Sequence, residues 1–350
     1  RPVLFNIHGG AFQTGDHSLN ADPVGTCAMD CILVTSSYRL GVLGFLQVDR
    51  YLGPDYVESG NCGMLDVIKA LEWVRDNIAA FGGDPERITM MGQSAGAMSI
   101  TDLLYCDKLK GLIRGAVLMS GGGAIPKLAG PWPKEKVADY WAKVRERAGA
   151  RDEESFRKLS PREIWEAWFA VCREDYNFHL VQPGIDGEII RDEPTRLLKA
   201  GKCLDIPLIF GVTSQDFLAP IIYYMMRRWG KTNDKLSMAP VYGYFFDRTP
   251  PGNSYKAFHS VDLWYVFGNM DKCWRPFEET DYALHRQMAD YIANFVRSGD
   301  PNGAGLPAWP RLSRQQRGLR KLDGVTEGLA YPRECWKKTL NTFLRDKGPM

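Results

Sequence analysis

A serine between glycines is the residue of this chain whose type and spacing best suit it to chemistry. Ser94 is the centre of the pentapeptide 92–96 (Gly-Gln-Ser-Ala-Gly), between an apolar run at 88–91 and a helix-compatible stretch at 97–105. In a nucleophile elbow a serine occupies a sharp turn from strand to helix, and the flanking glycines let the two elements approach closely. The pattern therefore predicts that Ser94 presents its hydroxyl as a nucleophile.

A serine nucleophile requires a histidine base and a carboxylate that orients the base. When the serine lies in an elbow, the acid follows it in the chain and the histidine comes last. Two histidines precede Ser94, a third lies in a helical segment before the later strands, and the last lies within a predicted helix. The predicted base is therefore the fourth, in the loop after the apolar run 241–246; the five are His8, His17, His179, His259 and His285.

The predicted acid is Asp216, the first carboxylate after the apolar run 206–211. Three other aspartates occupy positions typical of turn or cap residues, namely Asp186, Asp205 and Asp247. Asp216 alone lies in a loop of the kind that carries the acid, one strand before the loop of the histidine.

Negative charge that develops on a substrate carbonyl needs backbone N–H donors, and the loss of one typically costs on the order of 100- to 1000-fold in rate. Gly9 and Gly10 follow an apolar run directly, and Ala95 follows the serine. We predict these three N–H groups as an oxyanion hole. The alternative for the two glycines is a plain turn, which their coincidence with the elbow makes less attractive.

The elements that must position these residues alternate between strands and helices. Helical spacing of apolar residues predicts helices at 66–80 and 281–297. Strand-length apolar runs lie at 3–7, 31–35, 88–91, 115–120, 206–211 and 241–246. Such alternation predicts an α/β fold with a mostly parallel, doubly wound sheet.

The segment from about 125 to 194 changes character, with helical stretches at 137–148 and 161–172 and no convincing strand. We interpret it as a helical insertion or cap within a single domain that spans 1–350. Its aromatic residues could line a pocket, although core packing is the commoner role for such side chains. They are Trp132, Trp141, Trp165, Trp168, Tyr176 and Phe178, and Tyr223 and Tyr224 follow the acid loop.

Composition excludes several classes of protein. The formal net charge is +2 with no basic stripe, so nucleic-acid binding has no electrostatic footprint. No apolar stretch approaches the roughly 18 residues that a membrane span requires. The eight cysteines are scattered singly without zinc spacing, so we expect reduced thiols and neither a metal nor another cofactor.

The chain enters an apolar strand within two residues of Arg1 and has no initiator methionine, so it reads as a piece of a longer polypeptide. Any signal peptide would lie in the missing part. A cytoplasmic location is favoured, secretion stays open, and the sequence does not determine the oligomeric state.

A series of ordered motifs resembles the type B carboxylesterase/lipase family, which includes the para-nitrobenzyl esterases and the cholinesterases. The resemblance runs essentially from end to end. Its blocks are 6–12 (Asn-Ile-His-Gly-Gly-Ala-Phe), 38–45, 60–66, 70–96, 257–268, the Ser-Gly-Asp-Pro-Asn of 298–302 and the Trp-Pro of 309–310.

This resemblance implies an α/β-hydrolase fold and hydrolysis of carboxylic esters through an acyl-enzyme, without a cofactor. Carried over residue by residue, it implies the same triad, Ser94, Asp216 and His259, and the same oxyanion donors, Gly9, Gly10 and Ala95. Two readings stay open beside it. One is a catalytically inactive cholinesterase-like domain that binds a partner, and the other is a hydrolase of peptide or lipid ester bonds.

The chain also departs from the family. Asp216-Phe217 stands where Glu-Gly is usual, so the acid is shorter and has a bulky aromatic neighbour. Gln93 stands where Glu is common, and Ala97 where Gly is common. The strands that precede the oxyanion block in family members, and help to wall the active-site gorge, are not in the sequence.

Overall fold

A computed structural model describes residues 1–18, 29–121, 130–174, 181–252 and 254–332. Eight strands form one sheet in the order β2-β1-β3-β4-β5-β6-β7-β8, and every neighbouring pair is parallel except β7 with β8. The strands are β1 Val3–Ile7, β2 Ile32–Ser36, β3 Ile88–Gln93, β4 Gly115–Met119, β5 Leu208–Thr213, β6 Val241–Phe246, β7 Leu319–Leu322 and β8 Leu329–Ala330. The predicted α/β fold with a mostly parallel sheet is confirmed.

The central strands are apolar because helices cover both faces of the sheet. Every residue of β1, β3, β4 and β5 is buried, which is the burial that parallel sheets with two covered faces show. Alternate residues of β1 belong to different cores. Val3 and Phe5 pack with residues of α4, α5 and α10, whereas Leu4 packs with residues of α11 and α12.

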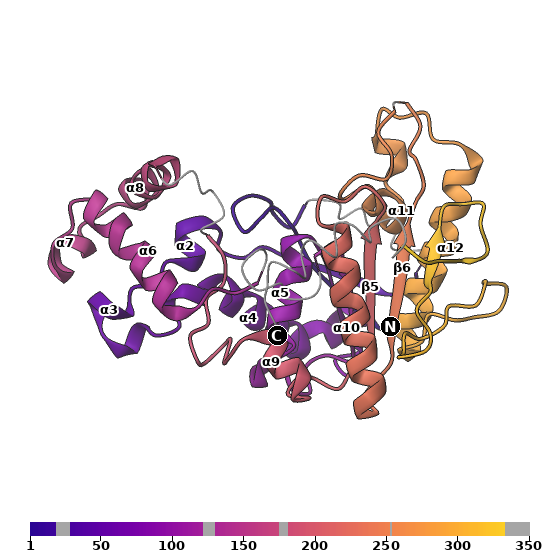
Figure 1. Cartoon of the computed structure of the whole chain (residues 1–350), viewed down its shortest axis with the longest axis horizontal. Helices are drawn as coiled ribbons and strands as arrows, with labels where there is room; N and C mark the ends of the chain where they lie inside the picture. Colours follow the sequence, from indigo (N-terminus) through magenta and orange to yellow (C-terminus); the bar gives the residue numbers. More distant parts are fainter. Residues whose placement is uncertain (19–28, 122–129, 175–180, 253, 333–350) are drawn as a thin grey trace.

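The helices surround the sheet as Figure 1 shows, with α6, α7 and α8 together at one end of the molecule and α12 at the other. The α-helices are α2 Gly41–Phe45, α3 Asp49–Leu52, α4 Cys62–Asn77, α5 Ala95–Leu103, α6 Lys134–Arg147, α7 Glu153–Arg157, α8 Pro161–Glu174, α9 Pro194–Lys199, α10 Ala219–Leu236, α11 Asp262–Phe267 and α12 Glu279–Ser298. Short 3₁₀ turns lie at Pro54–Tyr56, Ser59–Asn61, Ile78–Phe81, Asp107–Leu109 and Met270–Lys272. None of the described helices is both long and apolar enough to cross a membrane.

The described part of the segment 125–194 contains the helices α6, α7 and α8 and an irregular stretch at 181–193, and its only strand-like pairing is a bridge between Trp132 and Gly184. Trp132, Trp141 and Trp168 are buried, so these tryptophans pack into the core, whereas Trp165 is 47% exposed. His179, Tyr176 and Phe178 lie outside the described residues. The division into one domain with an insertion stays a prediction.

Candidate active site

Ser94 lies at the turn between β3 and α5, as the elbow pattern predicts. Its backbone has φ 56° and ψ −123°, and its N–H donates to the carbonyl oxygen of Met119 on the neighbouring strand at 2.9 Å. The flanking positions have no room for a side chain, so both must be glycine. A Cβ on Gly92 would lie 2.6 Å from the backbone of Gly96, and a Cβ on Gly96 would lie 2.1 Å from the carbonyl oxygen of Ile7.

Asp216 and His259 meet across two neighbouring loops, which follow β5 and β6. The Nδ1 atom of His259 lies 2.8 Å from Oδ2 of Asp216, and the Asp216 side chain is fully buried. The N–H of Gln215 donates to the carbonyl oxygen of Ala257 at 2.9 Å and ties the two loops together. With the proton on Nδ1, the imidazole donates to the carboxylate and its Nε2 atom is left as an acceptor.

Gln93, the residue before the elbow serine, contacts the other imidazole nitrogen. Its amide Nε2 lies 3.1 Å from Nε2 of His259, and it donates this hydrogen bond when the imidazole proton is on Nδ1. The Gln93 side chain therefore links the serine elbow to the histidine loop. The sequence singled out this position only as a departure from Glu and assigned it no role.

The loop after β1 packs against the elbow. A Cβ on Gly9 would lie 3.1 Å from Cβ of Ser94, so Gly9 is a close neighbour of the serine. Gly10 has φ 110°, and its carbonyl oxygen accepts from both Gln13 and Thr14 at 3.0 Å, which closes a tight turn. Ala95 begins α5, so its N–H is one of the orphan donors of a helix N-terminus.

Non-glycine residues with positive φ gather at this site. They include Ala11 at 54°, Phe12 at 62°, Ser94 at 56° and Ser260 at 74°. Each such residue costs about 1–3 kcal/mol and persists where the surrounding structure holds it, commonly at functional sites. The positive φ of Ala11 was not suggested by the sequence, because its side chain gives no sign of this backbone conformation.

A pocket of about 180 Å³ opens beside these residues. It lies between the loop after β1, the end of β3 and the first residues after His259. Its lining residues are Asn6, Ile7, His8, Gly9, Gly10, Gln93, Ser260, Leu263 and Phe267. The volume is enough for a small organic group. Gly9 and Gly10 line the pocket directly, whereas Ser94 and His259 are represented only by their chain neighbours Gln93 and Ser260.

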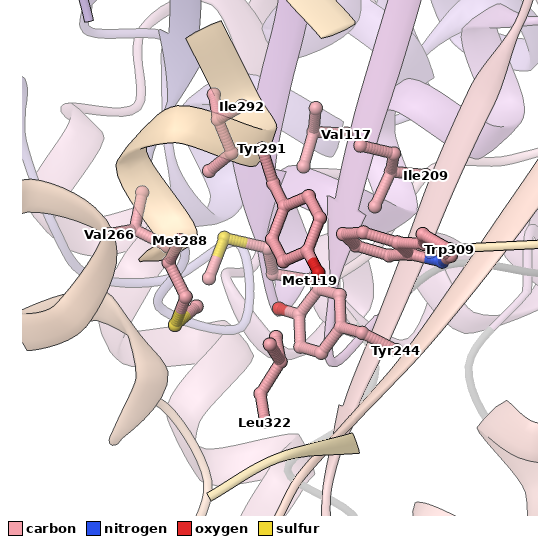
Figure 2. Close-up of a pocket in the computed structure, with 10 residues that line it drawn as sticks. All are labelled: Val117, Met119, Ile209, Tyr244, Val266, Met288, Tyr291, Ile292, Trp309 and Leu322. Carbon is pink, nitrogen blue, oxygen red and sulfur yellow. The ribbon is translucent and has the colours of Figure 1, made fainter. Parts of the chain in front are cut away.

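A second cavity lies under α12 and is too small for a substrate. Figure 2 shows aromatic and aliphatic side chains that close around it, Tyr244, Tyr291 and Trp309 among them. Its volume is about 10 Å³, close to the minimum that one water molecule needs.

The other described histidines have structural contacts. Nδ1 of His8 bonds to the carbonyl oxygen of Gly9 at 2.8 Å, and its ring stacks on Tyr38 with centroids 4.6 Å apart. Nδ1 of His285 bonds to the carbonyl oxygen of Tyr265 at 2.8 Å, and His17 bonds to Ser37. Their contacts agree with their rejection as the base.

The three rival aspartates have contacts elsewhere in the structure, and Asp186 is the one with the turn contacts that the sequence indicated. Oδ1 of Asp186 accepts from three backbone N–H groups, those of residues 188, 189 and 190, at 2.9 to 3.0 Å. Oδ1 of Asp205 accepts from the N–H of Ala239 at 2.6 Å. The N–H of Asp247 donates to Leu322 at the end of the sheet.

Asp262 is a buried carboxylate that the sequence did not single out. Its Oδ2 atom accepts from the hydroxyl of Tyr244 at 2.6 Å, and its Oδ1 atom has no hydrogen-bond partner among the described residues. Burial raises its pKa to about 6, although the Tyr244 hydroxyl and the nearby His259 act in the opposite direction. A second titratable carboxylate thus lies behind the histidine loop.

Comparison with known sequences establishes the class. The sequence profile of the carboxylesterase family matches residues 1–238 and 231–330, so the chain belongs to this family. Membership and fold together make it a carboxylic ester hydrolase.

Particular relatives are similar to this chain along most of its length. The cocaine esterase of Homo sapiens is 28% identical over 99% of this chain and 73% of its own length. The para-nitrobenzyl esterase of Bacillus subtilis is 29% identical over 92% of this chain and 76% of its own. The crystal structure of the Geobacillus stearothermophilus carboxylesterase EST55 at pH 6.2 aligns with a TM-score of 0.83 and 28% identity, covering 97% of this chain and 82% of that one.

Proposed function

We propose that the protein hydrolyses carboxylic esters through an acyl-enzyme on Ser94, with His259 as the base and Asp216 as the acid that orients it. The observation that carries this proposal is the 2.8 Å contact between His259 Nδ1 and the buried Asp216 carboxylate, beside an elbow serine with φ 56°. Each of the three groups comes from a loop at the carboxyl edge of the sheet, where catalytic residues of such folds lie.

The chemistry proceeds in two halves. The Gln93 amide must first leave His259 Nε2, which it contacts at 3.1 Å. His259 Nε2 then accepts the Ser94 proton while the serine oxygen attacks the ester carbonyl carbon and forms a tetrahedral intermediate. The carbon–oxygen bond to the alcohol then breaks, and the alcohol leaves with the proton that His259 returns. Water, deprotonated by His259, attacks the acyl-enzyme in the same way, and the carboxylic acid departs from a regenerated serine.

The negative charge of the tetrahedral intermediate requires donors that are already in place. Gly9, Gly10 and Ala95 are the proposed donors, and the Ala11 N–H is a further candidate from the same loop. The contact between Gly9 and the serine Cβ supports this assignment. The pocket of about 180 Å³ that adjoins the loop after β1 would take one side of a small ester.

The comparisons leave the substrate open within the esters, because relatives carry names as different as acylcarnitine hydrolase and para-nitrobenzyl esterase. The catalytically inactive alternative finds no support in them. All three predicted triad residues are present, and two of them form the hydrogen bond that the reaction needs.

Replacement of the nucleophile tests the proposal. We expect Ser94→Ala to lower kcat/KM for p-nitrophenyl acetate by at least about 10³-fold, because an acyl-enzyme can no longer form. Ser99→Ala is the matched control: it removes a buried hydroxyl of α5, the helix that follows Ser94, and this hydroxyl donates to the carbonyl oxygen of Ala95. Retained activity in Ser94→Ala, with the control also active, would refute the assignment.

A further inference from the structure

Phe217, the residue directly after the acid, is exposed and yet touches the base. Its side chain is 71% exposed, and its ring centroid lies 4.5 Å from that of His259 with the planes tilted by 51°. Single exposed apolar residues are ordinary on protein surfaces. An exposed ring that contacts the imidazole of the base is not ordinary. The rest of the Phe217 ring stays open to solvent beside the reacting groups.

A hydrogen-bonded turn fixes the position of this ring. The Asp216 N–H donates to Thr213 at 3.3 Å, and the Ala219 N–H donates to the carbonyl oxygen of Asp216 at 3.2 Å. The Leu218 N–H donates to Oδ1 of Asp216 at 3.2 Å. Because the backbone on both sides of Phe217 is held, its ring is presented at little further cost in conformational entropy when a ligand covers it.

The proton transfers define which part of a substrate meets this ring. His259 returns its proton to the leaving alcohol, so the alcohol oxygen must come within about 3 Å of the imidazole. A ring that already contacts the imidazole therefore lies next to the alcohol side of the ester rather than at a remote surface. In the family pattern this position is usually Gly, which would offer the alcohol no such surface.

We propose that Phe217 is a specificity-determining residue that binds an aromatic or flat apolar group of the leaving alcohol. This inference rests on the proposed function and extends it to a substrate class, the esters of aromatic alcohols. Ring pairs of this kind contribute beyond the area that they bury, through offset-stacked or edge-to-face contacts.

Three esters separate the alcohol side from the acyl side: 2-naphthyl acetate, methyl acetate and methyl benzoate. We expect Phe217→Ala to lower kcat/KM for 2-naphthyl acetate by about tenfold, equivalent to about 1.4 kcal/mol. The two methyl esters should change less than twofold. The ratio kcat/KM is the right quantity because it covers the steps through departure of the alcohol. Phe217→Trp, which keeps an aromatic surface, should retain the preference.

Phe81→Ala is the matched control, since Phe81 is 64% exposed and lies in the 3₁₀ turn after α4, where the next residue, Gly82, accepts from the Arg1 amino group before β1 begins. Equal losses for all three esters would overturn the inference, because Phe217 would then only position the imidazole. A loss confined to methyl benzoate, or no loss, would also overturn it. A wild-type protein that hydrolyses none of the three would instead contradict the proposed function.

Discussion

Replacement of Asp216 by asparagine is expected to trap His259 in the wrong tautomer. Asp216 now accepts on both oxygens, from the Leu218 N–H on Oδ1 at 3.2 Å and from His259 Nδ1 on Oδ2 at 2.8 Å. An asparagine oxygen would keep the fixed backbone donor, so the amide NH₂ would face the imidazole. Nδ1 must then accept and Nε2 carries the proton, which prevents it from taking the proton of Ser94.

The size of the effect follows from the hydrogen bonds that the active tautomer would forfeit. With the amide reversed, the Leu218 N–H and the NH₂ group would both lack acceptors in a buried site. Each unsatisfied donor costs about 2 kcal/mol, so the active arrangement lies about 4 kcal/mol above the inactive one. At 1.36 kcal/mol per factor of ten, kcat should fall by about 10³-fold.

The assay is kcat for p-nitrophenyl acetate across pH 6 to 9, together with the thermal midpoint of each variant. Asp205→Asn is the control, because Asp205 caps the N–H of Ala239 away from the site. We expect Asp216→Asn to fold normally and to stay slow at every pH, with the control near wild type. A folded Asp216→Asn protein within tenfold of wild type would show that the carboxylate does not set the tautomer.

Three further variants test the electrostatics. Gln93→Glu places a carboxylate where an amide lies 3.1 Å from His259 Nε2. The negative charge favours the protonated imidazole, so the acid limb of the pH–rate profile should shift to higher pH by about one unit. Burial raises the pKa of Asp262 to about 6, so urea titration should show Asp262→Asn about 3 kcal/mol more stable than wild type above pH 6, with no gain below pH 4. Burial opposes ionisation of Asp281, but hydrogen bonds from Arg248, the Glu278 N–H and the Tyr265 hydroxyl together outweigh it and hold its pKa below the ordinary value. The free energy of unfolding of Asp281→Asn should therefore be about 3 kcal/mol lower than that of wild type at pH 7, and this difference should shrink below about pH 3.8.

Local sequence rules were sufficient for the strands β1 to β6 and for the serine elbow. Buried parallel strands are short apolar runs, and the predicted run at 88–91 became β3 directly before Ser94. The glycines of the elbow follow from close backbone contacts that any side chain would block. The order of the chain then reduced five histidines to His259, and the structure brings that residue to Asp216.

Features that depend on tertiary geometry were not predictable in the same way. No apolar pattern predicted β7 or β8, because these charged or short segments pair only once β6 is in place. Helix α10 was also missed, although its buried residues Ile222, Met226 and Trp229 recur at helical spacing in the sequence. The contacts of Gln93 and Phe217 with His259 depend on loop conformations and side-chain rotamers.

The most direct test of the account is covalent labelling with a fluorophosphonate, followed by mass spectrometry of the labelled peptide. We expect one adduct per chain on Ser94, and labelling at least about 10³-fold slower in His259→Ala, because the hydroxyl then lacks its base. Stoichiometric labelling of a different residue, or labelling of Ser94 at an unchanged rate in His259→Ala, would contradict the claim that these side chains form one catalytic unit.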